Sequence, residues 1–110
     1  MEDIFCKIVK REIPAKIRYE DEEFISFDDI NPKAKIHILL ITKKHIPSVA
    51  ALEDDDAPLI AKMIILAKKI ATEAGMESYR LVFNSGKDSG QEVDHIHLHI
   101  LGGNRLGNMA

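Results

Sequence analysis

The sequence has no tryptophan, a single cysteine, and no long apolar run in its 110 residues. The lone Cys6 cannot form an intramolecular disulfide, which is typical of proteins from reducing compartments. No stretch approaches the roughly 18 apolar residues that a membrane-spanning helix needs. Asp and Glu outnumber Lys and Arg by 18 to 15, so the net charge of -3 does not favour nucleic acid or anionic lipid. We therefore expect neither nucleic-acid nor membrane binding.

The remaining composition is that of an ordinary globular protein, with 45% hydrophobic and 30% charged residues. The first residues, MEDIFCKIVKREIP, are acidic and then amphipathic, unlike the basic start and apolar middle of a signal peptide. The length is typical of one domain, and we find no internal repeat or linker. We expect a cytoplasmic protein with a single domain over residues 1–110.

The hydrophobic pattern predicts two helices of different length. A short one starts at Asp3 and is limited by Pro14, and a longer one covers residues 57–73, with an apolar face at helical spacing. That face consists of Ile60, Met63, Ala67, Ile70 and Ala74. Five segments rich in β-branched and apolar residues are expected as strands: 15–21, 23–30, 35–42, 79–84 and 92–101. Strands in runs with one long helix predict an α+β fold with a mainly antiparallel sheet.

The segment HIHLHIL, residues 95–101, holds three of the five histidines at alternate positions. On a strand, His95, His97 and His99 share one face about 6.5–7 Å apart, while the apolar residues between them face the core. Three interpretations remain at this point: a polar face that is rich in histidine by chance, a metal site, or a catalytic array. A metal site would need further ligands, for which Cys6 and His45 or the other histidine, His37, are the candidates.

The loop before these histidines, SGKDSGQ at 85–91, consists of small and polar residues. Gly86 and Gly90 let the backbone approach a ligand, and exposed N–H groups suit anions. Asn84 and Gln91 add neutral hydrogen-bonding groups at its two ends. A plain connection between strands would look similar, but an anion-binding loop beside imidazoles favours phosphate chemistry over a closed metal site.

These residues resemble one known family. HIHLHIL matches the His-x-His-x-His-x-x signature of the histidine triad (HIT) superfamily. The segments IFCKIVKREIPAKIRYED, SFDDINPKAKIHILLITKKHI, YRLVFNSG and GQEVDHIHLHILGG are similar to its Hint branch. The resemblance implies a HIT-like fold and a homodimer with one continuous sheet. It also implies hydrolysis of the P–N bond of purine nucleoside 5′-phosphoramidates, such as AMP or GMP conjugates of amines, without a cofactor.

The resemblance also implies roles for four histidines. His97 would attack the α-phosphorus and form a nucleotidyl-histidine intermediate, with its other ring nitrogen held by a backbone carbonyl near His95. His99 would contact the phosphate and help to protonate the leaving amine. His95 and His37 would support these two residues.

Further residues would bind the nucleotide. Asp29 would accept hydrogen bonds from both ribose hydroxyls, although in FDDINP it can also cap the turn before Pro32. The apolar walls around the base would be Ile4, Phe5, Phe27, Ile30 and Leu39, which can equally be ordinary core residues. The residues lining the phosphate would be Asn84, Gly90, Gln91 and Glu92.

The sequence departs from the family pattern near the triad. Glu92 occupies a position where a serine of animal members donates to the phosphate, and an ionised carboxylate cannot donate. We expect Glu92 to point away and to offer only its N–H; alternatively, it contacts the amine of the leaving group. Asp94 is expected near an edge or solvent, because burying its charge would be costly.

A second departure concerns metal. Some bacterial relatives start with Cys-x-x-Cys and bind structural zinc with two histidines, whereas this chain has Asp3 and Cys6 at that spacing. We expect no metal; if zinc binds, its ligands would be Cys6, His45 and His95, with Asp3 as a possible fourth. Two other functions remain as alternatives: a nucleotide-binding scaffold with little turnover, and a dinucleoside polyphosphate hydrolase.

Overall fold

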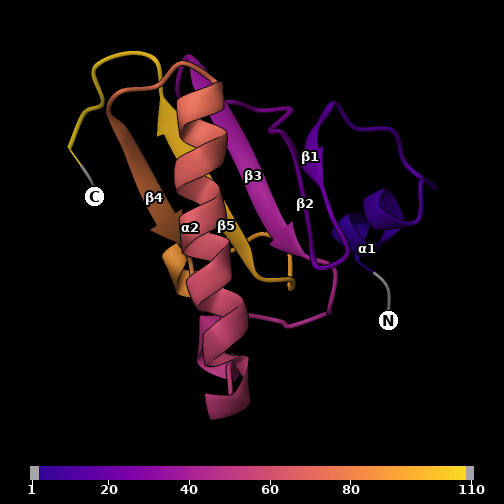
Figure 1. Cartoon of the computed structure of the whole chain (residues 1–110). Coiled ribbons are helices and arrows are strands. Elements are labelled where there is room, and N and C mark those ends of the chain that lie inside the picture. The colour runs from indigo at the N-terminus through magenta and orange to yellow at the C-terminus, as the bar shows by residue number, and fades with distance from the viewer. Residues whose placement is uncertain (1–2, 109–110) are drawn as a thin grey trace.

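The computed structural model describes residues 3–108 and arranges them around one five-stranded antiparallel sheet (Figure 1). The helices and strands are α1 (Ile4–Val9), β1 (Ile17–Glu20), β2 (Phe24–Asp28), β3 (Ile36–Thr42), α2 (Ala57–Glu73), β4 (Tyr79–Phe83) and β5 (His97–Gly102). Three 3-10 turns, η1 (Val49–Ala51), η2 (Asp54–Asp56) and η3 (Lys87–Ser89), lie in the connections. The strand order is β1-β2-β3-β5-β4. The predicted α+β class, with one long and one short helix, is confirmed.

Helix α2 lies across one face of the sheet (Figure 1). It begins after a capping box in which Glu53 and Asp56 each bond the other's backbone N–H, and Pro58 sits in its first turn. Its apolar face is the predicted one: Met63, Ala67 and Ile70 are buried. Against them pack the inward residues of the central strands, Ile38, Leu40, Leu98 and Ile100. Neither helix within residues 3–108 combines the length and apolarity needed to cross a membrane.

The opposite face of the sheet is covered only in part. Strand alternation sends Leu39 and Ile41 to this side, where they join Ile25 and Phe27 in a second apolar cluster. Helix α1 adds Phe5 and Ile8 to the same cluster. Because α1 has only six residues, it covers only part of this face, with Phe5 reaching as far as His97 on β5.

Strand β5 is shorter than the sequence predicted. It starts at His97 rather than at residue 92, because the N–H of His95 bonds the carbonyl of Val93 (2.8 Å) in a tight bend. His95 therefore lies before the strand rather than on it, although Phe5 contacts the rings of both His95 and His97 (centroids 5.9 and 5.0 Å away). Asp94 lies in this bend and is exposed, as expected.

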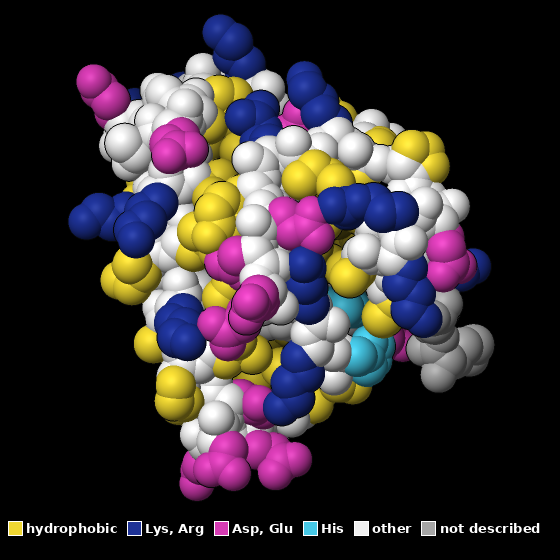
Figure 2. Space-filling view, turned by 45° about the vertical axis from the view of Figure 1, so that its right-hand side comes forward, with side chains coloured by type: hydrophobic (Ala, Val, Ile, Leu, Met, Phe, Trp, Pro, Cys, Tyr) yellow, Lys and Arg dark blue, Asp and Glu magenta, His cyan; other side chains and the backbone are white. Residues whose placement is uncertain are grey.

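The surface carries charges of both signs. Figure 2 shows basic and acidic side chains interspersed over the face in view. Several form ion pairs, including Lys43 with Glu20 (2.7 Å) and Lys44 with Asp56 (2.9 Å). That face does not present the one-sign basic patch that nucleic-acid binding requires.

Candidate active site

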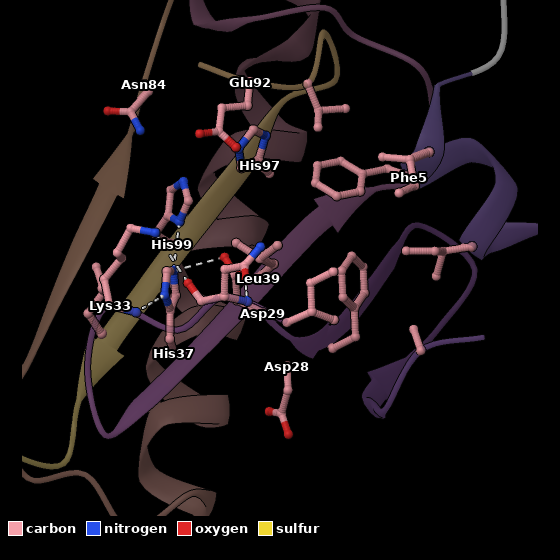
Figure 3. Close-up of a pocket in the computed structure, with 18 of the residues that line it drawn as sticks. Phe5, Asp28, Asp29, Lys33, His37, Leu39, Asn84, Glu92, His97 and His99 are labelled. Carbon is pink, nitrogen blue, oxygen red and sulfur yellow. Dashed lines mark hydrogen bonds and ion pairs between the residues drawn. The ribbon is translucent and has the colours of Figure 1, made fainter. Parts of the chain in front are cut away.

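A cavity of about 640 Å³ opens on the side of the sheet away from α2 (Figure 3). This volume lies within the range of small-molecule sites, about 300–1,000 Å³. Most residues that the sequence suggested for nucleotide binding line it: Ile4, Phe5, Phe27, Asp29, Ile30, His37, Leu39, Asn84, Gly90, Glu92, His97 and His99. The histidines lie toward one side and the apolar residues of α1 and β2 toward the other, so the cavity is amphipathic.

Two predicted site residues do not line the cavity. Gln91 holds the loop together instead: its side-chain N–H groups donate to the carbonyls of Pro47 (2.7 Å) and Val93 (3.0 Å), and its oxygen accepts from Gly86 N (2.8 Å). His95 is fully buried and does not line the cavity. Both residues therefore support the site without facing a ligand there.

Other cavity residues were not singled out from the sequence. Leu101 follows His99 at the next position on the same strand face, and Val82 lies directly opposite His99 across the β4–β5 ladder. Strand alternation and register would have found both. Lys33 comes from the turn before β3 and contributes through its backbone, for which the sequence carries no signal.

A backbone contact fixes the tautomer of His97. Its Nδ1 lies 2.7 Å from the carbonyl oxygen of His95. A carbonyl only accepts, so Nδ1 carries the proton and Nε2 keeps its lone pair. Burial is the main reason why the pKa of His97 lies below its ordinary value, which keeps the ring neutral. The edge contact with Phe5, at 5.0 Å between ring centroids, fixes the ring orientation further. The predicted backbone contact to His95 is confirmed.

His99 and His37 form a direct pair beside His97. His37 Nε2 lies 2.8 Å from His99 Nδ1, and the His99 ring centroid is 4.9 Å from that of His97. Burial, followed by the neighbouring rings of His97 and His37, lowers the pKa of His99 to about 4. Burial also lowers the pKa of His37, against the opposing effect of the Asp29 carboxylate. All three cavity histidines are therefore uncharged at neutral pH.

Asp29 serves the turn and faces the histidines with different oxygens. Its Oδ1 accepts from the N–H of Asn31 (2.8 Å), which confirms the turn-capping interpretation. Its Oδ2 lies 3.4 Å from His37 Nε2 at the edge of the cavity. The two roles considered for Asp29 are thus compatible, and its ribose contact stays a prediction.

Asn84 and Glu92 lie near the His97 end of the cavity (Figure 3). Asn84 comes from the end of β4, where it offers a neutral amide. Glu92 is exposed, and its carboxylate is drawn on the His97 side of the cavity rather than turned away. The expectation that Glu92 offers only its N–H is not supported by this placement.

A second group of ligating side chains lies under α1, and we call Asp3, Cys6, His45 and His95 the α1 cluster. The Nε2–H of His95 donates to the Thr42 carbonyl (2.6 Å), so in the neutral ring Nδ1 has a lone pair. That nitrogen is 3.1 Å from Asp3 Oδ2 and 3.6 Å from Cys6 Sγ. His95 Nδ1 and Asp3 Oδ2 are then both acceptors, so a proton or a metal ion must lie between them.

The α1 cluster has a set of donor atoms that would suit zinc, and the expectation of no metal stays a prediction. One ligand atom from each of its four residues lies within 4.8 Å of the others. A thiolate, two imidazoles and a carboxylate are all common zinc ligands, and four suffice for tetrahedral coordination. Such an ion would be structural: it would tie α1 to the start of β5 and lie outside the cavity.

Comparisons with known proteins agree with this geometry. A family model described as "Scavenger mRNA decapping enzyme C-term binding" matches residues 2–108. A HIT-like protein from Synechocystis sp. is 48% identical over 101 residues, covering 91% of this chain and 89% of that protein.

Solved structures show the same relationship. A HIT family hydrolase from Legionella pneumophila superposes with a TM-score of 0.93 at 47% identity, covering 96% of each chain. A histidine triad nucleotide-binding protein from Candida albicans has a TM-score of 0.80 at 29% identity, covering 99% of this chain and 86% of that one. The chain belongs to the histidine triad family.

Proposed function

We propose that this protein is a nucleotide-binding hydrolase that cleaves the P–N bond of purine nucleoside 5′-phosphoramidates through His97. The observation that carries the proposal is the hydrogen bond from His97 Nδ1 to the His95 carbonyl. It leaves the Nε2 lone pair of a buried, neutral imidazole in a cavity of nucleotide size. The hydrolase and nucleotide-binding relatives support this function.

In the reaction, His97 Nε2 bonds to the α-phosphorus while the P–N bond breaks and its electron pair goes to the amine nitrogen, which takes a proton from the solvent. Water then attacks phosphorus and returns a proton to the solvent, the electron pair of the Nε2–P bond goes back to Nε2, and the nucleoside monophosphate leaves. While Nε2 is bonded to phosphorus, the His97 ring is cationic. The His95 carbonyl, which accepts from Nδ1, stabilises that positive charge.

The nucleoside would occupy the apolar part of the cavity. Phe5, Phe27 and Ile30 form its walls, and a purine ring buries most of its surface against such residues. Ile30 is 86% exposed, so a bound base would cover apolar surface that faces water in the free protein. Asp29 Oδ2 would accept from the ribose hydroxyls between base and phosphate.

Hydrolysis of an adenosine 5′-phosphoramidate with a fluorescent amine tests the proposal in wild type and His97→Gly. We expect release of amine and AMP by wild type and a loss of turnover in the variant. Equal rates would disprove the nucleophile assignment. Cleavage of dinucleoside polyphosphates in preference to the P–N bond would replace the substrate class, and AMP binding without turnover of either would favour a scaffold.

We also propose that the protein forms a homodimer through β4. This strand is an edge of the sheet, and Leu81 on it is exposed, as are Ile64 and Ile65 on α2. An uncovered edge beside exposed apolar side chains suits pairing with a second copy. Sedimentation analysis should give a dimer for wild type and a monomer for Leu81→Arg; a wild-type monomer would contradict the proposal.

A further inference from the structure

The hydrogen bonds of His37 fix its tautomer. The backbone N–H of Lys33 donates to His37 Nδ1 at 3.0 Å. A backbone N–H cannot accept, so His37 Nδ1 must hold a lone pair and the single ring proton must be on Nε2. The Asp29 carboxylate, at 3.4 Å from Nε2, is a second acceptor that favours the same position of the proton.

The tautomer of His99 follows from that of His37. His37 Nε2 carries the proton, so His99 Nδ1 at 2.8 Å must accept it, as the dashed contacts in Figure 3 show. The proton of the neutral His99 ring is then on its own Nε2. This nitrogen is buried without a hydrogen-bond partner in residues 3–108, and His99 lines the cavity. A buried N–H without an acceptor is costly, so the site is preorganised for a ligand atom that accepts.

We propose that the backbone N–H of Lys33, acting through His37, fixes His99 as a hydrogen-bond donor to the phosphoryl group. Lys33 and His37 are positioning residues, because they set the proton on His99 without touching the reacting atoms. The identity of the acceptor, a phosphoryl oxygen or the leaving nitrogen, rests on the proposed function. The tautomer itself does not.

The result is that two neighbouring histidines present the same nitrogen, Nε2, to the ligand in opposite protonation states. His97 offers a lone pair at Nε2 because the His95 carbonyl holds its Nδ1 proton. His99 offers an N–H at Nε2 because the Lys33 amide, two rings away, excludes the other tautomer. A phosphorus atom can therefore meet the nucleophile while an atom bonded to it meets the donor. Neither ring needs a positive charge for this arrangement.

Nitrogen-15 NMR of the whole uniformly labelled protein at neutral pH tests the proposal without substrate. We expect a protonated Nε2 and an unprotonated Nδ1 for His37 and His99, and the reverse for His97. A His99 proton on Nδ1, or a doubly protonated His99 or His37, would overturn the proposal.

A matched pair of variants at one position separates the amide from the side chain. Lys33→Pro removes the N–H that donates to His37, and Lys33→Ala keeps it. We expect mixed tautomers of His37 and His99 in the first variant and wild-type tautomers in the second. Mixed tautomers in both variants, or in neither, would contradict this relay from the Lys33 amide through His37 to His99. If Lys33→Pro does not fold, His37→Phe replaces it, with mixed tautomers expected at His99.

The same proteins distinguish the relay from the proposed function. The expected tautomers without phosphoramidate hydrolysis would leave the relay standing and remove the function. Hydrolysis by wild type with a different His99 tautomer would do the opposite. With both intact, His37→Phe should lower kcat more than it weakens AMP binding, because the donor is then present in only part of the molecules.

Discussion

The cavity histidines and the α1 cluster both contain imidazole rings, but the hydrogen-bonding conditions around the rings differ. Around His37, His97 and His99, the hydrogen bonds each join a donor to an acceptor while the rings stay neutral. In the α1 cluster, Nδ1 of the neutral His95 ring keeps a lone pair and faces Asp3 Oδ2 at 3.1 Å, so a proton or a metal ion must lie between these two acceptors. The role of each imidazole is set by the partner of its second nitrogen rather than by its place in the HxHxH motif.

The largest expected effect tests the nucleophile. His97→Asn keeps a polar group of similar size but lacks the attacking nitrogen, so kcat should fall by at least about 10³-fold. AMP affinity, measured by calorimetry, should change far less, because the walls and Asp29 remain. Retained turnover would mean that a group other than His97 attacks phosphorus.

The next effect tests whether His99 acts as a donor. His99→Leu removes the N–H and should lower kcat by about 10²–10³-fold, as for loss of one donor to a transition state. His99→Gln has an amide that can donate from a similar distance and should lose less. Stopped-flow kinetics with both variants gives the comparison. Equal losses would show that donation is not what His99 contributes.

The α1 cluster should respond to metal rather than to substrate. Zinc binding to the folded state alone adds about 2.7 kcal/mol to the free energy of unfolding at one hundred times the Kd. If zinc binds this cluster, it should raise the Tm of wild type, and a chelator should reverse the rise. Cys6→Ala, which removes one ligand, should show a smaller rise. No zinc dependence in wild type would mean that a proton alone separates these acceptors.

The cavity histidines should make the protein less stable in mild acid. Burial lowers the pKa of folded His99 to about 4, whereas the unfolded chain has the ordinary value of 6.5. Between these values the unfolded state binds more protons than the folded state. The contribution of His99 to the free energy of unfolding is therefore complete above pH 6.5 and is lost as the pH falls toward 4. Denaturant titrations of wild type and His99→Gln measure this, and the variant should have the shallower dependence. Parallel pH profiles would contradict a neutral, buried His99.

The sequence predicted most of the fold, because the spacing of apolar residues and the local composition indicate helices and strands directly. The apolar face of α2 and the strand segments follow from spacing, and the caps from Pro58 and the acidic residues before it. The sequence did not predict features that depend on single backbone hydrogen bonds. The bend between Val93 and His95, which ends the strand before His95, has a local hydrogen bond that the sequence pattern does not indicate. The same holds for the Lys33 amide, because every residue but proline has an N–H.

The smallest expected effect concerns Glu92, the carboxylate at the His97 end of the cavity (Figure 3). An exposed charge acts on a phosphate through water and salt, so its effect is limited to about 1 kcal/mol. Glu92→Gln should therefore tighten AMP binding several-fold at low ionic strength, and the gain should shrink as salt is added. Asp94→Asn is the matched control, since Asp94 is exposed two residues away and does not line the cavity. Weaker AMP binding in Glu92→Gln would instead mean that the carboxylate accepts a hydrogen bond from the nucleotide.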